Sequence, residues 1–183
     1  MLSHYYRDKP NCIAKIEKIL TANGRINPRV KVEIRWFYRQ EDAIGGRKSF
    51  HGTKELFSSD HVDTQSVDTI VEKCNVYSMD EYNNLDKVEE NDFFCRFEYQ
   101  RLTGAFSPES ITVYCRCEMP ENPDREMIDC ENCGDRFHPA CLDMTAEMAK
   151  QLNHFICQPC LSAMEMVKKS KIIYPVATAG AFW

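Results

Sequence analysis

The stretch CENCGDRFHPAC, residues 130–141, has the ligand spacing of a zinc-binding protein. It reads Cys-x-x-Cys, four spacer residues and then His-x-x-Cys. Two such residues a few positions apart can reach one metal ion from a tight turn, and thiolate and imidazole groups are the ligands that zinc prefers. The stretch therefore predicts zinc binding rather than disulfides. It also raises a question about Arg136, which stands two residues before the histidine.

The pattern continues on both sides of this stretch. Eight soft ligands suit two tetrahedral zinc ions, and closed sites of that kind leave no position for a catalytic water, which disfavours a metallohydrolase. A segment this short has room for only a small hydrophobic core, so the metals would supply much of its folding free energy. The ligands, in chain order, are Cys115, Cys117, Cys130, Cys133, His138, Cys141, Cys157 and Cys160.

The composition carries no signal for a membrane or secreted protein. The chain has 183 residues, of which 43% are hydrophobic and 28% charged, as is ordinary for folded domains. No apolar run is long enough to cross a bilayer, and the first residues, MLSHYYRDKP, lack the apolar core of a secretory signal. The three cysteines outside the ligand pattern, Cys12, Cys74 and Cys95, are expected to be core thiols.

Charge is concentrated in the cysteine-rich segment. Residues 115–160 hold nine Asp and Glu residues against four Lys and Arg residues, so this segment carries a charge of −5, equal to that of the whole chain. An acidic module repels nucleic acid, so no direct sequence-specific DNA binding is expected. Such a module suits a cationic partner such as a basic peptide tail. The same acidic charge is equally typical of a solvated surface that has no partner.

The first part of the chain predicts β-structure. Apolar and charged residues alternate in VKVEIRWFYR, residues 30–39, and again in FFCRFEYQ, residues 93–100. Short strands between polar loops indicate a barrel or sandwich. We therefore predict a β-rich domain over residues 1–112, a zinc domain over 113–161, and a tail over 162–183 that begins with one or two helical turns.

Longer runs of sequence resemble the small plant proteins that join a BAH (bromo-adjacent homology) domain to a PHD finger. The resemblance covers residues 9–160 and rests on VEIRWFYRQEDAIGGRKSFHGTKE, from residue 32, and NDFFCRFEYQRLTGAFSPESITVYCRCEMPENPD, from residue 91. The ligand order, with the histidine fifth, is similar to that of PHD fingers. In RING fingers, which would suggest a ubiquitin ligase, the histidine comes one place earlier.

The resemblance implies a mainly β fold, a BAH-type β-barrel followed by a small cross-brace PHD finger with two zinc ions. It implies a nuclear chromatin reader and not an enzyme. The BAH domain of this family reads trimethylated lysine 27 of the histone H3 tail and the PHD finger reads trimethylated lysine 4. Members help to repress developmental genes, including those that control flowering, and corepressor proteins are expected as further partners.

The resemblance also assigns residues. One zinc ion would be held by Cys115, Cys117, His138 and Cys141, and the other by Cys130, Cys133, Cys157 and Cys160. The histone peptide would contact Trp36, Tyr38, His61 and Met127. Trp36 and Tyr38 stand two apart, which puts both rings on one face of a strand, where they either bind a cation or pack in the core.

The chain departs from the family at three cage positions. Cys12 stands where the BAH cage has an aromatic residue, and Glu121 and Arg136 stand where the finger has aromatic residues. Because a guanidinium offers no aromatic face and repels a methylammonium group, we expect a finger that folds but does not bind trimethylated lysine 4 tightly. Unmodified lysine is one alternative ligand for it. An alternative function is that of an interaction scaffold, in which both cages are impaired.

Overall fold

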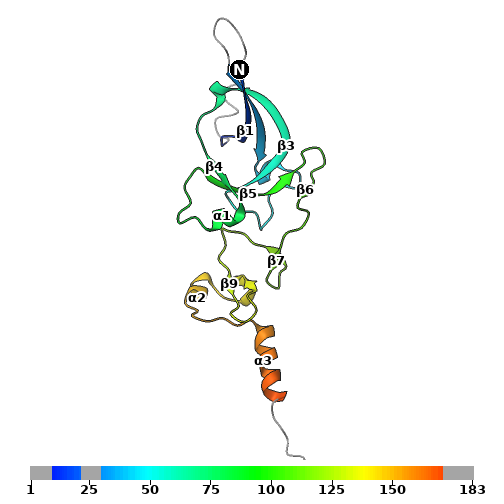
Figure 1. Cartoon of the computed structure of the whole chain (residues 1–183). Helices are drawn as coiled ribbons and strands as arrows, with labels where there is room; N and C mark the ends of the chain where they lie inside the picture. Colours follow the sequence, from blue (N-terminus) through cyan, green and yellow to red (C-terminus); the bar gives the residue numbers. More distant parts are fainter. Residues whose placement is uncertain (1–9, 22–29, 171–183) are drawn as a thin grey trace, which may run out of the picture. The chain divides into compact units, whose positions relative to one another are not determined.

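The computed structural model describes residues 10–21 and 30–170, which divide into two compact units (Figure 1). The first unit comprises residues up to Thr112 together with Pro120–Asp124, and the second comprises Val113–Met119 and the residues from Arg125 onward. The segment Pro120–Asp124 lies among the zinc ligands in sequence but folds with the first unit. Tyr5 and Tyr6, the aromatic residues that precede Cys12 in the sequence, lie outside the described residues.

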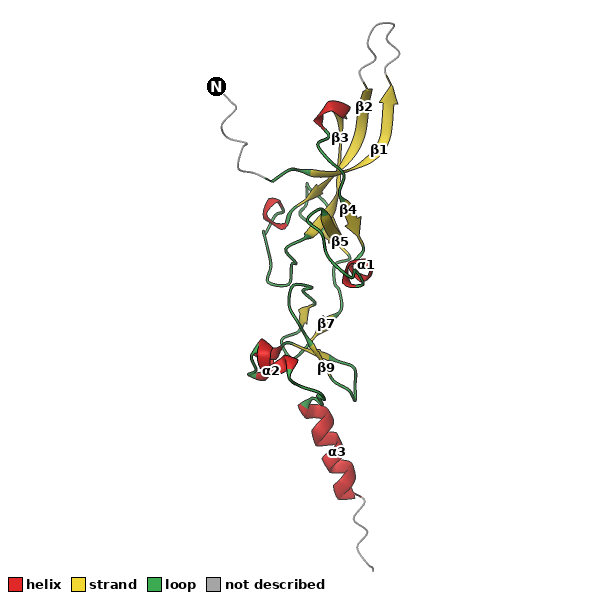
Figure 2. Cartoon of the chain, turned by 90° about the vertical axis from the view of Figure 1, so that its left-hand side faces the viewer, coloured by secondary structure: helices red, strands yellow, loops and turns green. Residues whose placement is uncertain are grey.

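A six-stranded sheet forms the first unit, in the order β1-β2-β3-β5-β4 with β6 paired to β5. The pairs β1–β2, β2–β3 and β5–β6 are antiparallel, whereas β5 runs parallel to both β3 and β4. Figure 2 shows β1 and β2 as a long hairpin. The strands are β1 (Ile13–Thr21), β2 (Val30–Tyr38), β3 (Glu55–Ser66), β4 (Asn75–Tyr77), β5 (Asp92–Tyr99) and β6 (Phe106–Ser107). Short helices are η1 (Gln40–Asp42), η2 (Val67–Thr69) and α1 (Met79–Asn83).

The alternation predicted over residues 30–39 is present in β2. Val32 and Ile34 are buried on one face of the sheet. On the other face, Glu33 pairs with Lys18 at 2.7 Å and Arg35 with Glu17 at 3.0 Å, both on the neighbouring strand β1. Residues of opposite charge across a strand pair hold register where one face meets solvent. The prediction of a mainly β first domain is confirmed.

Aromatic side chains fill the core of the first unit. Phe57 of β3 is fully buried, and its ring lies 6.0 Å from that of Phe97, 6.5 Å from that of Tyr99 and 5.0 Å from that of Phe106. A second cluster groups Ile13, Leu56 and Phe93. These contacts come from strands far apart in sequence, so the sheet and its core must form together.

The prediction of a core thiol is wrong for one of the three cysteines. Cys12 is exposed because it lies just before the edge strand β1, whereas Cys74 and Cys95 are half-buried. Burial raises the pKa of Cys95, as expected for a thiol among apolar groups.

The second unit contains little regular structure apart from its last helix. Two-stranded ladders pair β7 (Val113–Tyr114) with β8 (Met119–Pro120) and β9 (Ile128–Asp129) with β10 (Arg136–Phe137). They are followed by η3 (Pro139–Leu142), α2 (Ala146–Lys150) and α3 (Gln158–Ser170). The helix α3 has 13 residues and is longer than the one or two turns predicted. Among the described residues, no helix has the length and apolar character needed to span a bilayer.

Candidate zinc centres and peptide-binding surfaces

The first group of ligands joins two distant pairs. Cys115, Cys117, His138 and Cys141 place their donor atoms within 4.8 Å of one another. The backbone turns sharply at the first pair, with a positive φ of 62° at Cys115 and 50° at Glu118. Cys117 Sγ lies 3.4 Å from His138 Nδ1. The turn is what lets two cysteines separated by one residue face the same point.

The second group is Cys130, Cys133, Cys157 and Cys160, again with donor atoms within 4.8 Å of one another. Gly134, with a φ of +73°, closes the turn of the first pair, and the other pair lies where α3 begins. The N–H of Cys157 donates to Cys130 Sγ at 3.3 Å and lowers the pKa of that thiol to about 6. A thiol that ionises this readily is prepared to act as a metal ligand.

Both groups fit zinc. With Zn–S distances of about 2.3 Å, the sulfur atoms of a tetrahedral site lie roughly 3.8 Å apart, which these donor atoms can reach with small adjustments. One group combines the first and third ligand pairs along the chain and the other combines the second and fourth, as the resemblance implies. All four ligands of each ion would come from the protein, so zinc would crosslink the chain and add no open coordination site for catalysis.

The ligands also form much of the interior of the second unit. Cys115, Cys130 and Cys157 are buried there beside Phe137. The ring of Phe137 meets that of Phe155 edge-on at 5.6 Å. Without the metals, this interior would consist of two rings, a set of thiols and the partly buried side chains of Met127, Leu142 and Ile156.

Three predicted peptide-binding residues gather on the first unit. The ring of His61 lies 6.4 Å from that of Trp36 and 6.2 Å from that of Tyr38, tilted by 47° and 49°. Tyr38 Oη and His61 Nδ1 are 3.0 Å apart. All three side chains are partly exposed, and we call them the aromatic site. Tyr99 supports Tyr38 from the core side, with its ring at 5.3 Å.

An irregularity between β2 and β3 brings His61 to this site. Arg35 pairs with Val62, but Phe37 pairs with Ser58, so β3 carries extra residues opposite Trp36. Ser59 stabilises the bulge, because its hydroxyl donates to the carbonyl of Trp36 at 2.7 Å and accepts from the N–H of His61. Bulges commonly redirect a side chain beside a binding site.

Asp63 lies beside the aromatic site and was not predicted. Hydrogen bonds from the Gln65 amide, the Thr64 N–H and the Trp36 side chain lower the pKa of Asp63. The aromatic site therefore has a carboxylate next to one of its rings. The signal in the sequence was its position two residues after His61 in a strand, on the same face of the sheet.

The position of Cys12 follows from strand register. Ile13, the first residue of β1, pairs with Phe37 of β2, and one further step in the same register would set the preceding residue, Cys12, opposite Tyr38. Facing residues of antiparallel strands project to the same side of the sheet. In that register Cys12 would stand level with the aromatic site, where it offers an exposed thiol instead of a ring.

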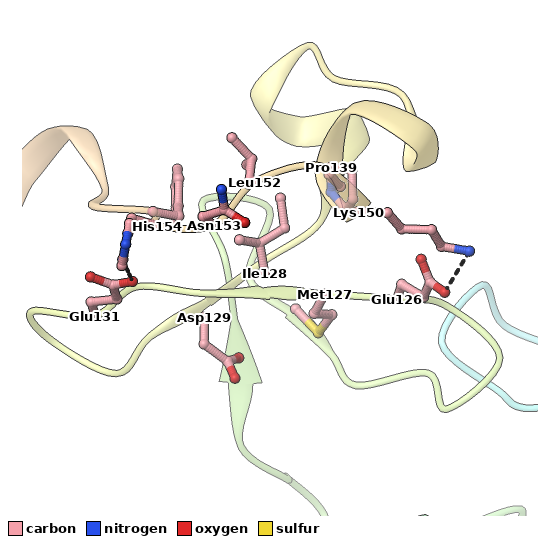
Figure 3. A pocket seen from close by; sticks show the side chains of 12 residues that line it. Glu126, Met127, Ile128, Asp129, Glu131, Pro139, Lys150, Leu152, Asn153 and His154 are labelled. Carbon is pink, nitrogen blue, oxygen red and sulfur yellow. Dashed lines mark hydrogen bonds and ion pairs between the residues drawn. The ribbon is translucent and has the colours of Figure 1, made fainter.

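Met127 lies on the second unit, in a groove of about 340 Å³ (Figure 3). Strand β9 and the segment that follows α2 form its sides, and two ion pairs lie at its ends, Glu126 with Lys150 at 3.0 Å and Glu131 with His154 at 2.7 Å. We call it the finger groove. It is lined by Glu126, Met127, Ile128, Asp129, Glu131, Pro139, Ala149, Lys150, Leu152, Asn153, His154 and Phe155.

Arg136 contacts two neighbours in the second unit. Its Nε lies 3.3 Å from the carboxylate of Asp129, and its guanidinium carbon lies 5.5 Å from the centre of the Tyr114 ring. Tyr114 was not predicted as a site residue. The signal available was an aromatic residue directly before the first zinc ligand. The face of the Tyr114 ring is therefore already in contact with a cation of the protein itself.

Comparison with known families matches the two units of the fold to two domain types. The family model of the BAH domain matches residues 1–110, and that of the PHD-finger matches residues 115–160. The chain is also similar to the solved structure of the yeast Rsc2 BAH domain, which matches 79% of this chain and 62% of its own at 16% identity, with a TM-score of 0.42.

Two curated proteins of Arabidopsis thaliana are similar along most of the chain. Chromatin remodeling protein EBS is 53% identical over 163 residues, which is 89% of this chain and 68% of that protein. Chromatin remodeling protein SHL is 52% identical over 153 residues, which is 83% of this chain and 66% of that protein. The chain thus spans about two thirds of the length of these relatives. The Drosophila nucleosome-remodeling factor subunit NURF301 is 35% identical over 83 residues, 42% of this chain and 3% of that protein.

Proposed function

We propose, since the chain belongs to the BAH–PHD chromatin proteins, that it is a histone-tail reader whose BAH domain binds trimethylated lysine 27 of histone H3. Both matched domains are binding modules and not enzymes. The protein would act in the nucleus as a repressive adaptor, with the H3 tail as its main partner and corepressor proteins as further partners.

The observation that carries the proposal is the convergence of Trp36, Tyr38 and His61 on one partly exposed point. A trimethylated lysine is a cation without an N–H to donate, so it is recognised by aromatic faces that attract charge and exclude water. The carboxylate of Asp63 beside Trp36 adds attraction for a cation. A cluster meant only for packing would be buried, as Phe57 and Phe97 are.

The PHD finger would contribute less to methyl-lysine recognition. Arg136 sits over the ring of Tyr114 and pairs with Asp129, so an incoming methylammonium group would meet a positive charge at the aromatic face. Three carboxylates line the finger groove beside Met127, and each already has a basic partner in the protein. We therefore propose weak or absent binding of trimethylated lysine 4.

A scaffold without histone binding is the alternative, and specific residues favour it. Cys12 offers no aromatic ring to add to the three of the aromatic site, and Arg136 contacts the ring of Tyr114. In that case chromatin proteins other than the H3 tail would be the partners.

Calorimetry on the zinc-loaded chain separates these functions. We expect micromolar binding of an H3 peptide trimethylated at lysine 27, and at least tenfold weaker binding of the unmodified peptide. Trp36→Ala removes a wall worth about 0.5–2 kcal/mol and should weaken binding by a factor of about 2–30. Tyr114→Ala is the matched control, because it truncates a partly exposed ring of the other unit. A folded protein that binds neither peptide would support the scaffold.

A further inference from the structure

The segment Pro120–Asp124 connects two zinc sites through the first unit. In sequence it lies between Cys117, a ligand of one site, and Cys130, a ligand of the other. In the structure these five residues fold with the first unit, while the residues on both sides belong to the second. The chain therefore leaves one zinc site, makes contacts of the first unit, and only then reaches the other site.

Asn122 and Asp124 provide the main polar contacts of this segment. The buried amide of Asn122 donates to the carbonyls of Ser49 at 3.0 Å and His51 at 3.4 Å, and its Oδ1 accepts from the N–H of Asp124. The carboxylate of Asp124 accepts from both the N–H and the hydroxyl of Thr53, the latter at 2.7 Å. A buried amide with three partners fixes both the place and the direction of the segment.

Arg96 and Gly52 hold the remaining residues of the segment. Arg96 donates to the carbonyl of Glu121 at 2.8 Å, and it is itself fixed by a buried ion pair with Glu55 at 2.7 Å. A Cβ atom at Gly52 would lie 3.1 Å from Pro123 and 2.9 Å from the ring of Phe94, so a side chain there would push the segment away. The contact is thus built from a charged pair, a close backbone approach and several hydrogen bonds.

Aromatic contacts lead from this segment to the aromatic site. His51, whose carbonyl accepts from Asn122, has its ring 5.1 Å from that of Phe57. The ring of Phe57 lies 6.5 Å from that of Tyr99, which lies 5.3 Å from that of Tyr38. Packed rings of this kind transmit small displacements, because a close-packed interior cannot deform without cost.

We propose that zinc binding by the finger stabilises the first unit through Pro120–Asp124, so that zinc is a structural effector of the domain that carries the aromatic site. Zinc at both sites fixes Cys117 and Cys130, which shortens the free chain that must be ordered before Asn122 and Asp124 meet Ser49 and Thr53. Without zinc, the same contacts must order a longer flexible segment. This inference concerns stability and does not rest on histone binding.

The test follows unfolding of the first unit in the full chain. The sequence has two tryptophans, so the substitution Trp183→Phe leaves Trp36 as the single fluorescent reporter of the first unit. Thermal unfolding is recorded for the zinc-loaded chain and after chelation, with released zinc measured by a colorimetric dye. We expect chelation to lower the midpoint reported by Trp36 by about 5–10 °C, as a loss of one to two kcal/mol would do in a domain of this size.

Variants of the segment separate coupling from a general effect of chelation. In Asn122→Ala and in Asp124→Ala, the zinc-dependent shift should fall to about half or less, because the connection is weakened while all eight ligands remain. Asn153→Ala, an exposed asparagine of the finger groove, is the matched control and should keep the full shift. If Asn122→Ala fails to fold, Asp124→Ala still decides the matter, since Asp124 is exposed.

Two results would overturn the inference. One is an unchanged Trp36 midpoint after both zinc ions have been released. The other is a zinc-dependent shift of full size in both segment variants. Either result leaves the proposed binding of histone peptides untouched, because peptide affinity is measured on the zinc-loaded chain.

Discussion

The two units of this chain build their interiors from different materials. In the first, rings from distant strands pack around the fully buried Phe57. In the second, buried cysteines of the zinc sites take that place, with Phe137 and Phe155 as the main apolar side chains. The comparison teaches that the first unit can hold its sheet by side-chain packing, whereas the second depends on metal. Four predictions test this difference, in order of decreasing effect.

Removing one ligand should be the most damaging change to the second unit. Structural zinc contributes on the order of 10 kcal/mol to small zinc domains, so Cys130→Ala should cost the finger its fold. Metal analysis should give at most one zinc ion per chain instead of two, and NMR signals of the finger should collapse. Cys74→Ala, a half-buried cysteine outside both ligand groups, should keep both ions. Two ions in Cys130→Ala would contradict the ligand assignment.

Truncating the aromatic core should damage the first unit instead. Phe57→Ala removes a fully buried ring and should lower the free energy of unfolding by about 3–5 kcal/mol, as large cavities in a core do. Urea denaturation followed by Trp36 fluorescence measures this. Val71→Ala, at a side chain that is 77% exposed, should change it by less than about 0.5 kcal/mol. Equal effects of both changes would mean that the core lies elsewhere.

Acidification should weaken the first unit through His51. Burial lowers the pKa of His51 to about 4, and Arg96 and Arg47 act in the same direction. Since the unfolded chain binds this proton near pH 6.5 and the folded one does not, stability is lost as pH falls from about 6.5 toward 4. Between pH 7 and 5, we expect the free energy of unfolding to fall by about 1–2 kcal/mol more in the native protein than in the His51→Gln variant. If the free energies of unfolding of the two proteins changed with pH by the same amount, this role of His51 would be excluded.

Restoring a ring at Cys12 should have the smallest effect of the four. Cys12 directly precedes Ile13, which pairs with Phe37, so the register extended by one residue would let Cys12→Tyr give the aromatic site a further wall worth about 0.5–2 kcal/mol. Calorimetry should show roughly 2- to 30-fold tighter binding of the peptide trimethylated at lysine 27. Cys12→Leu adds bulk without a π face and should not reproduce the gain. Equal gains in both variants would point to burial alone.

Local patterns were sufficient for part of this structure. The alternation in β2 and the ligand pairs could be predicted because strand period and turn spacing are properties of neighbouring residues. Tyr114 and the bulge that places His61 could not, because both depend on which segment lies opposite. The exposure of Cys12 follows from its place at a sheet edge, which the sequence does not mark. The membership of Pro120–Asp124 in the first unit depends on contacts of Asn122 with residues some seventy positions away.

NMR of the Trp36 indole shows whether the aromatic site binds a methylated cation. In the Trp183→Phe chain a single indole N–H signal remains, and it is followed during titration with three H3 peptides. One is trimethylated at lysine 27, one is unmodified, and one carries an uncharged tert-butyl isostere of the trimethylammonium group. We predict a saturable shift with the trimethylated peptide and at least tenfold weaker effects with the other two. An indole signal that stays in place throughout, or moves equally with all three, would contradict the account.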